Sequence, residues 1–295
     1  MRFSFPKLLS VCSAAFLFTP SVQAIEVLST VKPLHLIVND LTDGIADSDY
    51  LLPPGTSPHD YALRPSDVKK VKNADVLIWF GPDLERFLES FTRDKENVVT
   101  ISESKTVQFR EFGDHHDHHG HDHGSIDAHF WLGPEQAVAV ARDITVALSQ
   151  YDKLNSQAYQ ANLERFEANV QSTAAKLKTD LAPYKDKGYF VFHDAYGYFE
   201  ETFNLNNLGS FTVSPDRKPG AKTLINIRKS LQAKNAECVF SEPQFQPAVI
   251  ESVTRNTSVK RGELDPLASN IDVQLGSYSL FLKGLGDEFI RCLSK

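Results

Sequence analysis

The sequence predicts an α/β protein of two lobes, each built on a parallel β-sheet, with one long helix joining them. Two observations lead to this fold class. Short apolar stretches alternate with amphipathic helical patterns in both halves of the chain, as in parallel sheets that are covered by helices on both faces. Between the halves, residues 155–181 contain no glycine or proline, and their apolar residues recur at intervals of three and four, as in one continuous helix.

Four strands and their helices are expected in the first half. The strands are placed at residues 26–31, 48–52, 76–80 and 98–101. The intervening helices begin near Pro33, Pro65 and Asp83, and another helix covers residues 134–150. Proline suits a first helical turn because its missing N–H is not needed there.

The second half repeats the alternation. Its expected strands are residues 189–193, 210–213, 238–241 and 259–264, and its expected helices are residues 196–203, 223–234, 247–256 and 277–292. In sheets of this kind ligands bind beyond the carboxyl ends of the strands. Neither GxGxxG nor GxxxxGK[ST] occurs, so the pattern carries no nucleotide-binding fingerprint.

The first 24 residues have the pattern of a secretory signal peptide. Arg2 and Lys7 precede an apolar stretch, and a small-residue cleavage site ends at Ala24. Cys12 would permit lipid attachment, but Val11 is large for the position before a lipidated cysteine, so a soluble exported protein is preferred to a lipoprotein. Removal of the two basic residues takes the net charge from −7 to −9, which argues against nucleic-acid partners.

The mature chain divides into three expected parts. Residues 25–152 form the N-terminal lobe, residues 153–183 the connecting helix and residues 184–295 the C-terminal lobe. Cys238 and Cys292 are the two cysteines that remain, and an oxidising compartment favours a disulfide between them over two separate buried thiols.

A histidine-rich stretch lies within an expected loop over residues 113–124. So polar a segment cannot join a packed core, and dense imidazoles suit zinc, copper or nickel. A merely hydrophilic insertion and an engineered tag are the alternatives to an auxiliary metal-binding loop. Its histidines are His115, His116, His118, His119, His121 and His123.

Three further histidines stand where this architecture places ligand sites. His59 follows the second strand, His129 follows the histidine-rich stretch, and His193 ends the first strand of the second half. Each lies beside an aspartate that could orient its ring. We therefore interpret them as one metal site, whereas His35 on the first helix is expected to be a surface or structural residue.

Several motifs around these histidines resemble the metal-receptor clade of ABC-transporter solute-binding proteins, and specifically its periplasmic zinc receptors. They run in the family's order over nearly the whole mature chain. They are Pro-His-Asp-Tyr at 58–61, Arg-Pro-Ser-Asp at 64–67, Asp-Ala-His-Phe-Trp-Leu at 127–132, Phe-His-Asp-Ala-Tyr-Gly-Tyr-Phe-Glu at 192–200, Glu-Pro-Gln-Phe at 242–245 and Leu-Asp-Pro-Leu at 264–267.

The resemblance implies two (β/α)4 lobes with a metal site in the cleft between them. It implies that His59, His129 and His193 bind Zn(II), which is the transported ligand, and it agrees with a disulfide between Cys238 and Cys292. A membrane permease of a zinc ABC transporter is the expected partner, and a periplasmic accessory metal-binding protein is a further one. The receptor itself is expected to be a monomer and not an enzyme.

Two positions bear on the choice of metal. Manganese receptors of the same clade carry glutamate where His193 stands, and three imidazoles suit zinc better than a carboxylate-rich set does. Zinc receptors often have glutamate before the first ligand, where this chain has Pro58. The fourth ligand is therefore expected to be water or Asp265, with water preferred.

Three other functions remain open at this point: a manganese or iron receptor of the same family, a zinc-sequestering protein, and a zinc hydrolase. Three imidazoles and a water are also a catalytic zinc geometry. However, the metalloprotease motif HExxH is absent, and Glu200 or Glu242 could act as a base only if the fold delivers them to the metal.

Overall fold

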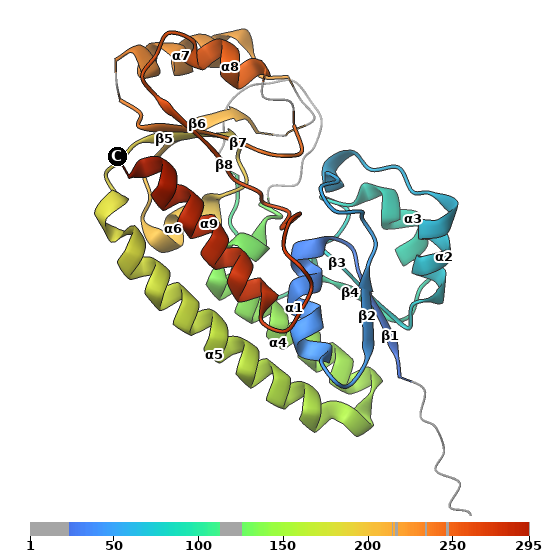
Figure 1. Ribbon diagram of the computed structural model, residues 1–295. Coiled ribbons are helices and arrows are strands. Elements are labelled where there is room, and N and C mark those ends of the chain that lie inside the picture. Colours follow the sequence, from blue (N-terminus) through green and yellow to red (C-terminus); the bar gives the residue numbers. More distant parts are fainter. Residues whose placement is uncertain are drawn as a thin grey trace, which may run out of the picture.

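The computed structural model describes residues 24–112, 126–213, 215, 218–233, 235–245 and 248–294. It contains two four-stranded parallel sheets, one in each half of the chain, which lie at opposite ends of a group of long helices (Figure 1). The predicted fold class is thus confirmed. The expected signal peptide falls almost wholly outside the described residues. Within the described parts of the chain, no helix has the length and apolar character that a membrane span needs.

The first sheet has the strand order β2-β1-β3-β4, with all neighbours parallel. Central strand β3 is buried at every position, because helices cover both faces of the sheet there. Strand β2 at the edge of the sheet alternates between exposed and half-buried residues. Helix α1 covers one face, and α2 and α3 cover the other (Figure 1). The bounds are β1 Glu26–Ser29, α1 Lys32–Thr42, β2 Asp47–Tyr50, α2 Pro65–Asn73, β3 Val76–Trp79, α3 Glu89–Thr92 and β4 Val98–Thr100.

The expected helix at Asp83 is wrong, because the chain makes a tight turn there and helix α3 begins only at Glu89. Glu85 is the physical reason. Its side chain is fully buried, and its carboxylate accepts hydrogen bonds from the backbone N–H groups of Phe80 and Gly81. Holding this carboxylate under the end of β3 prevents residues 81–85 from forming a helix. Burial raises the pKa of Glu85 to about 7.

The second sheet repeats this arrangement with the strand order β6-β5-β7-β8, again all parallel. Strand β5 is central and completely buried, and it matches the predicted range. Helices α7 and α8 cover one face, and α6 and α9 lie on the other (Figure 1). The bounds are β5 Tyr189–His193, α6 Gly197–Phe203, β6 Asn207–Thr212, α7 Ala221–Gln232, β7 Cys238–Ser241, α8 Ala248–Thr254, β8 Lys260–Glu263 and α9 Ser277–Leu293.

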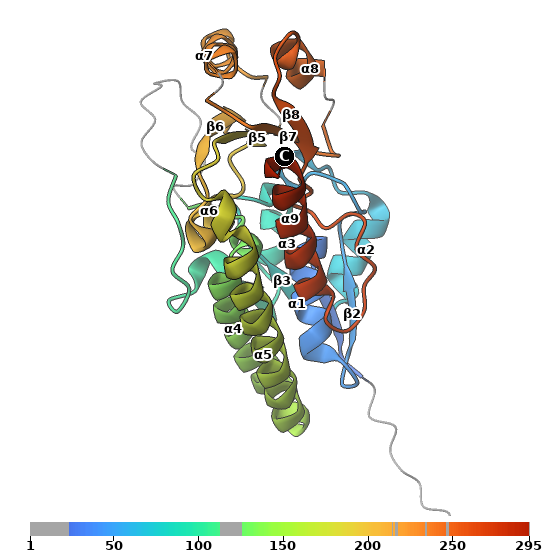
Figure 2. The same ribbon diagram turned by 60° about the vertical axis from the view of Figure 1, so that its left-hand side comes forward.

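The long helix α5, Ser156–Leu181, confirms the helix expected between the lobes. It packs beside α4 (Pro134–Tyr151) and also contacts α1 and α9, so it touches helices from both halves of the chain (Figure 2). A single apolar stripe makes these contacts, and it joins residues of both halves into one large core. The face of the second sheet beneath α7 and α8 has a separate core cluster. The buried residues of the stripe include Tyr159, Leu163, Phe166, Val170, Leu177 and Leu181.

A second connection crosses between the halves near the C-terminal end of the chain. The segment between β8 and α9 passes over the first half, where Trp131 Nε1 donates to Pro266 O at 2.8 Å and Lys32 Nζ donates to Ser269 O at 3.0 Å. The Asp40 carboxylate accepts from the N–H of Gly276 at 2.7 Å. The lobes are therefore joined both by α5 and by a hydrogen-bonded return segment, which restricts hinge motion between them.

The cysteines form the expected disulfide, which links the first residue of β7 to the last turn of α9. Both cysteines are buried, and they are 54 residues apart in sequence. Replacing Cys238 and Cys292 together by alanine should lower the free energy of unfolding by about 3–4 kcal/mol, because a long loop is no longer closed in the unfolded chain. Urea denaturation measures this change, and a loss below about 1 kcal/mol would contradict it.

Candidate metal site

Three chain segments bring His59, His129 and His193 together. His59 lies in a 3-10 turn after β2, His129 immediately precedes another 3-10 turn, and His193 is the last residue of β5. Each offers one ring nitrogen, and these three atoms all lie within 4.8 Å of one another. His129 Nε2 and His193 Nε2 are 3.3 Å apart. The structure thus assembles in one place the three histidines that the sequence analysis selected.

The three rings line a small cavity between the two halves of the molecule, together with Pro58, Glu242, Phe245, Pro266 and Leu267. His129 and His193 are each only 3% exposed, whereas His59 is half-buried and borders the outside. The cavity measures about 10 Å³, on the order of the space that one water molecule needs. Its size and lining suit a single ion and exclude an organic substrate.

A buried carboxylate fixes the ring of His129. Asp127 Oδ1 lies 2.8 Å from His129 Nδ1 and also accepts the backbone N–H of His129 at 3.0 Å. Asp127 is fully buried. This partner keeps the proton on Nδ1, so the lone pair of Nε2 faces the other two rings. The expectation that a neighbouring aspartate orients the ring is confirmed for His129.

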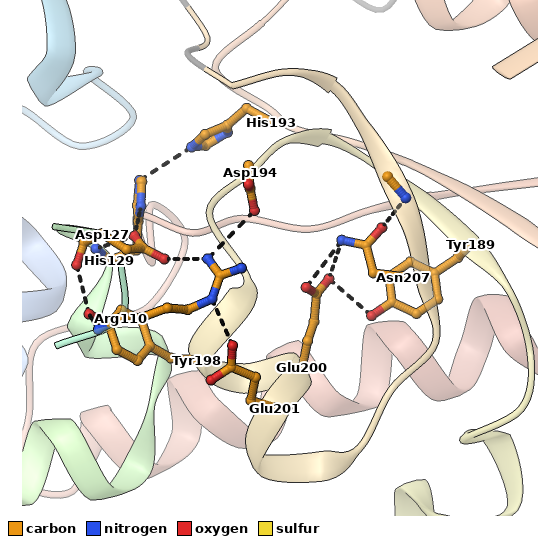
Figure 3. A network of polar contacts seen from close by, with 11 residues as sticks. Arg110, Asp127, His129, Tyr189, His193, Asp194, Tyr198, Glu200, Glu201 and Asn207 are labelled. Carbon is orange, nitrogen blue, oxygen red and sulfur yellow. Dashed lines mark hydrogen bonds and ion pairs between the residues drawn. The ribbon is translucent and has the colours of Figure 1, made fainter. Parts of the chain in front are cut away.

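For His193 the expected orienting residue is wrong. The neighbouring Asp194 points toward Arg110 (Figure 3). The ring Nδ1 of His193 instead contacts Glu242, at 2.7 and 2.8 Å from its two carboxylate oxygens. Glu242 follows β7, the strand beside β5, so the carboxyl ends of adjacent strands supply the pair. Burial by itself lowers the pKa of His193, but the carboxylates of Glu242, Asp127 and Asp194 together outweigh burial and raise the pKa.

Glu242 is held in turn by Tyr196, whose hydroxyl donates to Oε1 at 3.1 Å. The sequence placed Glu242 in a motif but gave it no role beside His193. The signal that could have found it is its position after the carboxyl end of a strand, which is the rule that selected His193 itself. Because Glu242 engages the ring, it is not available as a catalytic base.

Asp265 lies near the cavity lining but has other partners. Its carboxylate accepts hydrogen bonds from Gln244 Nε2 at 2.7 Å, from the N–H of Leu267 at 3.0 Å and from the N–H of Ser269 at 2.6 Å. It does not belong to the group of three histidines. These bonds hold the turn that follows β8.

Aromatic residues surround the histidines. Trp131 packs edge-on against His129 at 5.4 Å between ring centroids, and Phe245 packs against His193 at 6.5 Å. Phe192 stacks on Phe245 at 5.2 Å. Trp131 is fully buried. This shell keeps water from the inner side of the cavity and strengthens electrostatic interactions within it.

The remaining candidate residues have separate places. His35 is buried against Tyr50, and desolvation lowers its pKa to about 4, so it is a structural residue. Glu200 accepts hydrogen bonds from Tyr189 and Asn207 and is therefore no catalytic base. The six histidines of the expected loop lie outside the described residues. At the borders of that stretch, Glu111 and Ile126 form an antiparallel bridge.

Comparison with known proteins gives the family. The family model described as "ZnuA: Zinc-uptake complex component A periplasmic" matches residues 27–292. The high-affinity zinc uptake system protein ZnuA of Yersinia pestis is 40% identical over 305 residues, covering 96% of this chain and 96% of that protein. The protein of the same name from Haemophilus ducreyi is 39% identical and covers 97% of this chain and 99% of its own length.

Solved structures show the same fold. A crystal structure of ZnuA superimposes with a TM-score of 0.76 at 21% identity, covering 92% of this chain and all of the other. The Mn2+ complex of the solute-binding protein FpvC from Pseudomonas aeruginosa gives a TM-score of 0.78 at 23% identity, covering 92% of this chain and 99% of that one. By the match over residues 27–292 and the full-length identity, the chain belongs to the ZnuA family of periplasmic zinc-uptake components.

Proposed function

We propose that this protein captures Zn(II) in the cleft between its two lobes and delivers it to the permease of an ABC transporter. The observation that carries the proposal is the convergence of His59, His129 and His193, which offer three nitrogens within 4.8 Å of one another. Three neutral imidazoles match the ligand number and type of an open zinc site. The protein is a transport receptor and not an enzyme, in agreement with its family.

The donor set favours zinc over manganese. Imidazole nitrogen suits zinc, whereas manganese favours carboxylate and water oxygen. Both buried carboxylates beside the rings, those of Asp127 and Glu242, contact Nδ1 atoms of the histidines and so act as orienting partners. A manganese or iron receptor would need some of these carboxylates to bind the metal directly.

We propose that water completes the zinc tetrahedron. Asp265 was the other expected fourth ligand, but four backbone and side-chain donors already bind its carboxylate. Using Asp265 as a ligand would break the turn that leads to α9. Pro58, which occupies the position of a carboxylate in many zinc receptors, offers no donor.

The site also explains how zinc could be held without large lobe movement. Helix α5 and the return segment over Trp131 and Lys32 both connect the lobes, so the histidines are already close together. We assign residues 25–152 and 184–295 to the two lobes, with residues 153–183 joining them. Release to the permease then requires only a small change in lobe geometry.

The location and the auxiliary loop complete the proposal. The family is periplasmic, and we propose that export removes a signal peptide after Ala24. The histidine-rich stretch is proposed to bind further zinc more weakly, because a polar segment loses conformational entropy when it binds metal. A periplasmic accessory metal-binding protein could draw on the same stretch.

The cleft and the histidine-rich stretch can be tested separately by calorimetric titration of chelator-stripped protein with Zn(II). His193→Ala should abolish the tight binding event, because it removes one of three ligands from the cavity. Deletion of residues 114–123 should keep that event and lower the total zinc capacity. If His193→Ala binds as tightly as the wild type, the three-histidine site is wrong, and the stretch becomes the main binding element.

Zinc affinity should depend on pH. Zinc binds neutral imidazole, and the carboxylate of Glu242 raises the pKa of His193 in the metal-free protein. Protons therefore compete with zinc as the pH falls through this raised pKa. We expect affinity to fall by about tenfold or more between pH 7.5 and 5.5. A competition titration that gives the same affinity at both pH values contradicts this site.

Glu242→Gln tests the carboxylate that orients His193. The amide cannot hold the ring proton as strongly, so zinc affinity should fall by about tenfold. The pH at which affinity begins to fall should also move lower, because the charge that raises the pKa of His193 is gone. Glu251→Gln, on the exposed side of α8, is the matched control and should change neither quantity. Equal results for the two variants would remove Glu242 from the site.

A further inference from the structure

Arg110 places one guanidinium among carboxylates from both halves of the chain. Its Nη1 lies 3.0 Å from Asp127 Oδ2 and 3.8 Å from Asp194 Oδ1, and its Nε donates to Glu201 Oε1 at 2.8 Å. Figure 3 shows these three contacts meeting at the same side chain. Asp127 belongs to the first half, whereas Asp194 and Glu201 follow β5 in the second half. The cation therefore bridges the two halves beside the histidine cavity.

Two of the three carboxylates that Arg110 contacts, those of Asp127 and Asp194, belong to residues close in sequence to two of the histidines. Asp127 uses its other oxygen to hold His129 Nδ1, and Asp194 follows His193 in the chain. The nearest ring nitrogens of these two histidines are only 3.3 Å apart. Arg110 thus connects the rings of His129 and His193 through Asp127 and Asp194. The separation of these two rings sets the size of the cavity.

The backbone around Arg110 is tied to the same residues. The N–H of Arg110 donates to Tyr198 Oη at 2.8 Å, and that hydroxyl donates to the carbonyl of Asp127 at 2.8 Å (Figure 3). The carbonyl of Arg110 accepts the N–H of Asp127 at 2.7 Å. With its backbone fixed twice and three quarters of its side chain buried, Arg110 has little freedom to turn away.

Gly197 makes room for this arrangement. It is the first residue of α6, and a Cβ added there would lie 2.3 Å from Arg110 Cζ and 2.3 Å from Nη1. A side chain at this position would collide with the guanidinium of Arg110. The position of the Arg110 guanidinium therefore requires glycine at position 197.

We propose that Arg110 is a positioning residue of the zinc site, which sets the spacing and orientation of His129 and His193 by bridging Asp127 and Asp194. This inference rests on the proposed function, because it assigns a role toward zinc in the same cavity. Arg110 does not touch the metal in this proposal. It neutralises the buried Asp127 carboxylate and keeps one of its oxygens aimed at the ring of His129.

Loss of the guanidinium leaves Asp127 as an uncompensated buried charge near Asp194, and the two carboxylates then repel each other. Asp127 can then turn away from His129, and the distance between the rings of His129 and His193 is no longer fixed. Loss of an orienting partner of this kind costs about 10- to 100-fold in metal affinity. A lysine could reach only one carboxylate at a time, because it lacks the planar fork of arginine.

The experiment compares Arg110→Gln, Arg110→Lys and Gly197→Ala with Gly284→Ala as a matched control. Gly284 lies inside α9, and a Cβ there would meet nothing within 4 Å. Zinc affinity is measured by chelator competition, the ligand geometry by the visible absorption of bound Co(II), and the stability of the metal-free protein by thermal unfolding.

We expect Arg110→Gln and Gly197→Ala each to weaken zinc binding by about 10- to 100-fold and to change the Co(II) spectrum. Arg110→Lys should recover part of the loss, and Gly284→Ala should match the wild type. The double variant of Arg110→Gln with Gly197→Ala should be no weaker than Arg110→Gln alone, because both changes remove the same contact.

A lower unfolding temperature with zinc affinity within about twofold of wild type and an unchanged Co(II) spectrum would overturn the proposal and leave Arg110 a purely structural residue. Gly197→Ala provides the same test if Arg110→Gln does not fold. Weak zinc binding by the wild type itself would instead contradict the proposed function, so the two failures are distinguishable.

Discussion

The protein has to keep one nitrogen from each of three imidazole rings within 4.8 Å of the other two, in a cleft where two of the rings are buried. Unprotonated ring nitrogens that point at one another cannot form hydrogen bonds between themselves. Each ring in the low-dielectric cavity therefore needs a partner that fixes its tautomer. Asp127 and Glu242 meet this need for the two buried rings by contacting Nδ1 and leaving Nε2 directed inward. Much of the structure around the cavity serves to hold these two carboxylates.

Both halves of the fold contribute to that end. Parallel strands bring their carboxyl ends to one edge, so His193 after β5 and Glu242 after β7 become neighbours although 49 residues separate them. The first half supplies His59 and His129 from turns that face this edge. Helix α5 and the return segment before α9 hold the two halves in a fixed relative position, and this position brings the three histidines together.

Most of the fold could be predicted from the sequence because its signals are local. The apolar run Tyr189–His193 and the apolar stripe of α5 are each visible within one short stretch of the sequence. His129 and its partner Asp127 are two residues apart, so their pairing could also be expected. The three histidines were found because each stands at a strand end or in a loop that such folds use for binding.

The errors concern side chains whose contacts are decided only when the chain is folded. Asp194 is adjacent to His193, yet the ring is held by Glu242, because only the assembled sheet decides which carboxylate lies opposite Nδ1. The helix expected to begin near Asp83 starts only at Glu89, since Glu85 turns inward to bind the end of β3. Periodicity cannot reveal such a buried acid.

The most direct test of the account is a crystal structure of the mature protein with one equivalent of Zn(II), using anomalous scattering at the zinc edge to locate the ion. The account predicts one principal peak, at about 2.0–2.1 Å from a ring nitrogen of each of His59, His129 and His193, with a water as the fourth ligand. A principal peak held by other residues, with these three histidines free of metal, would contradict it.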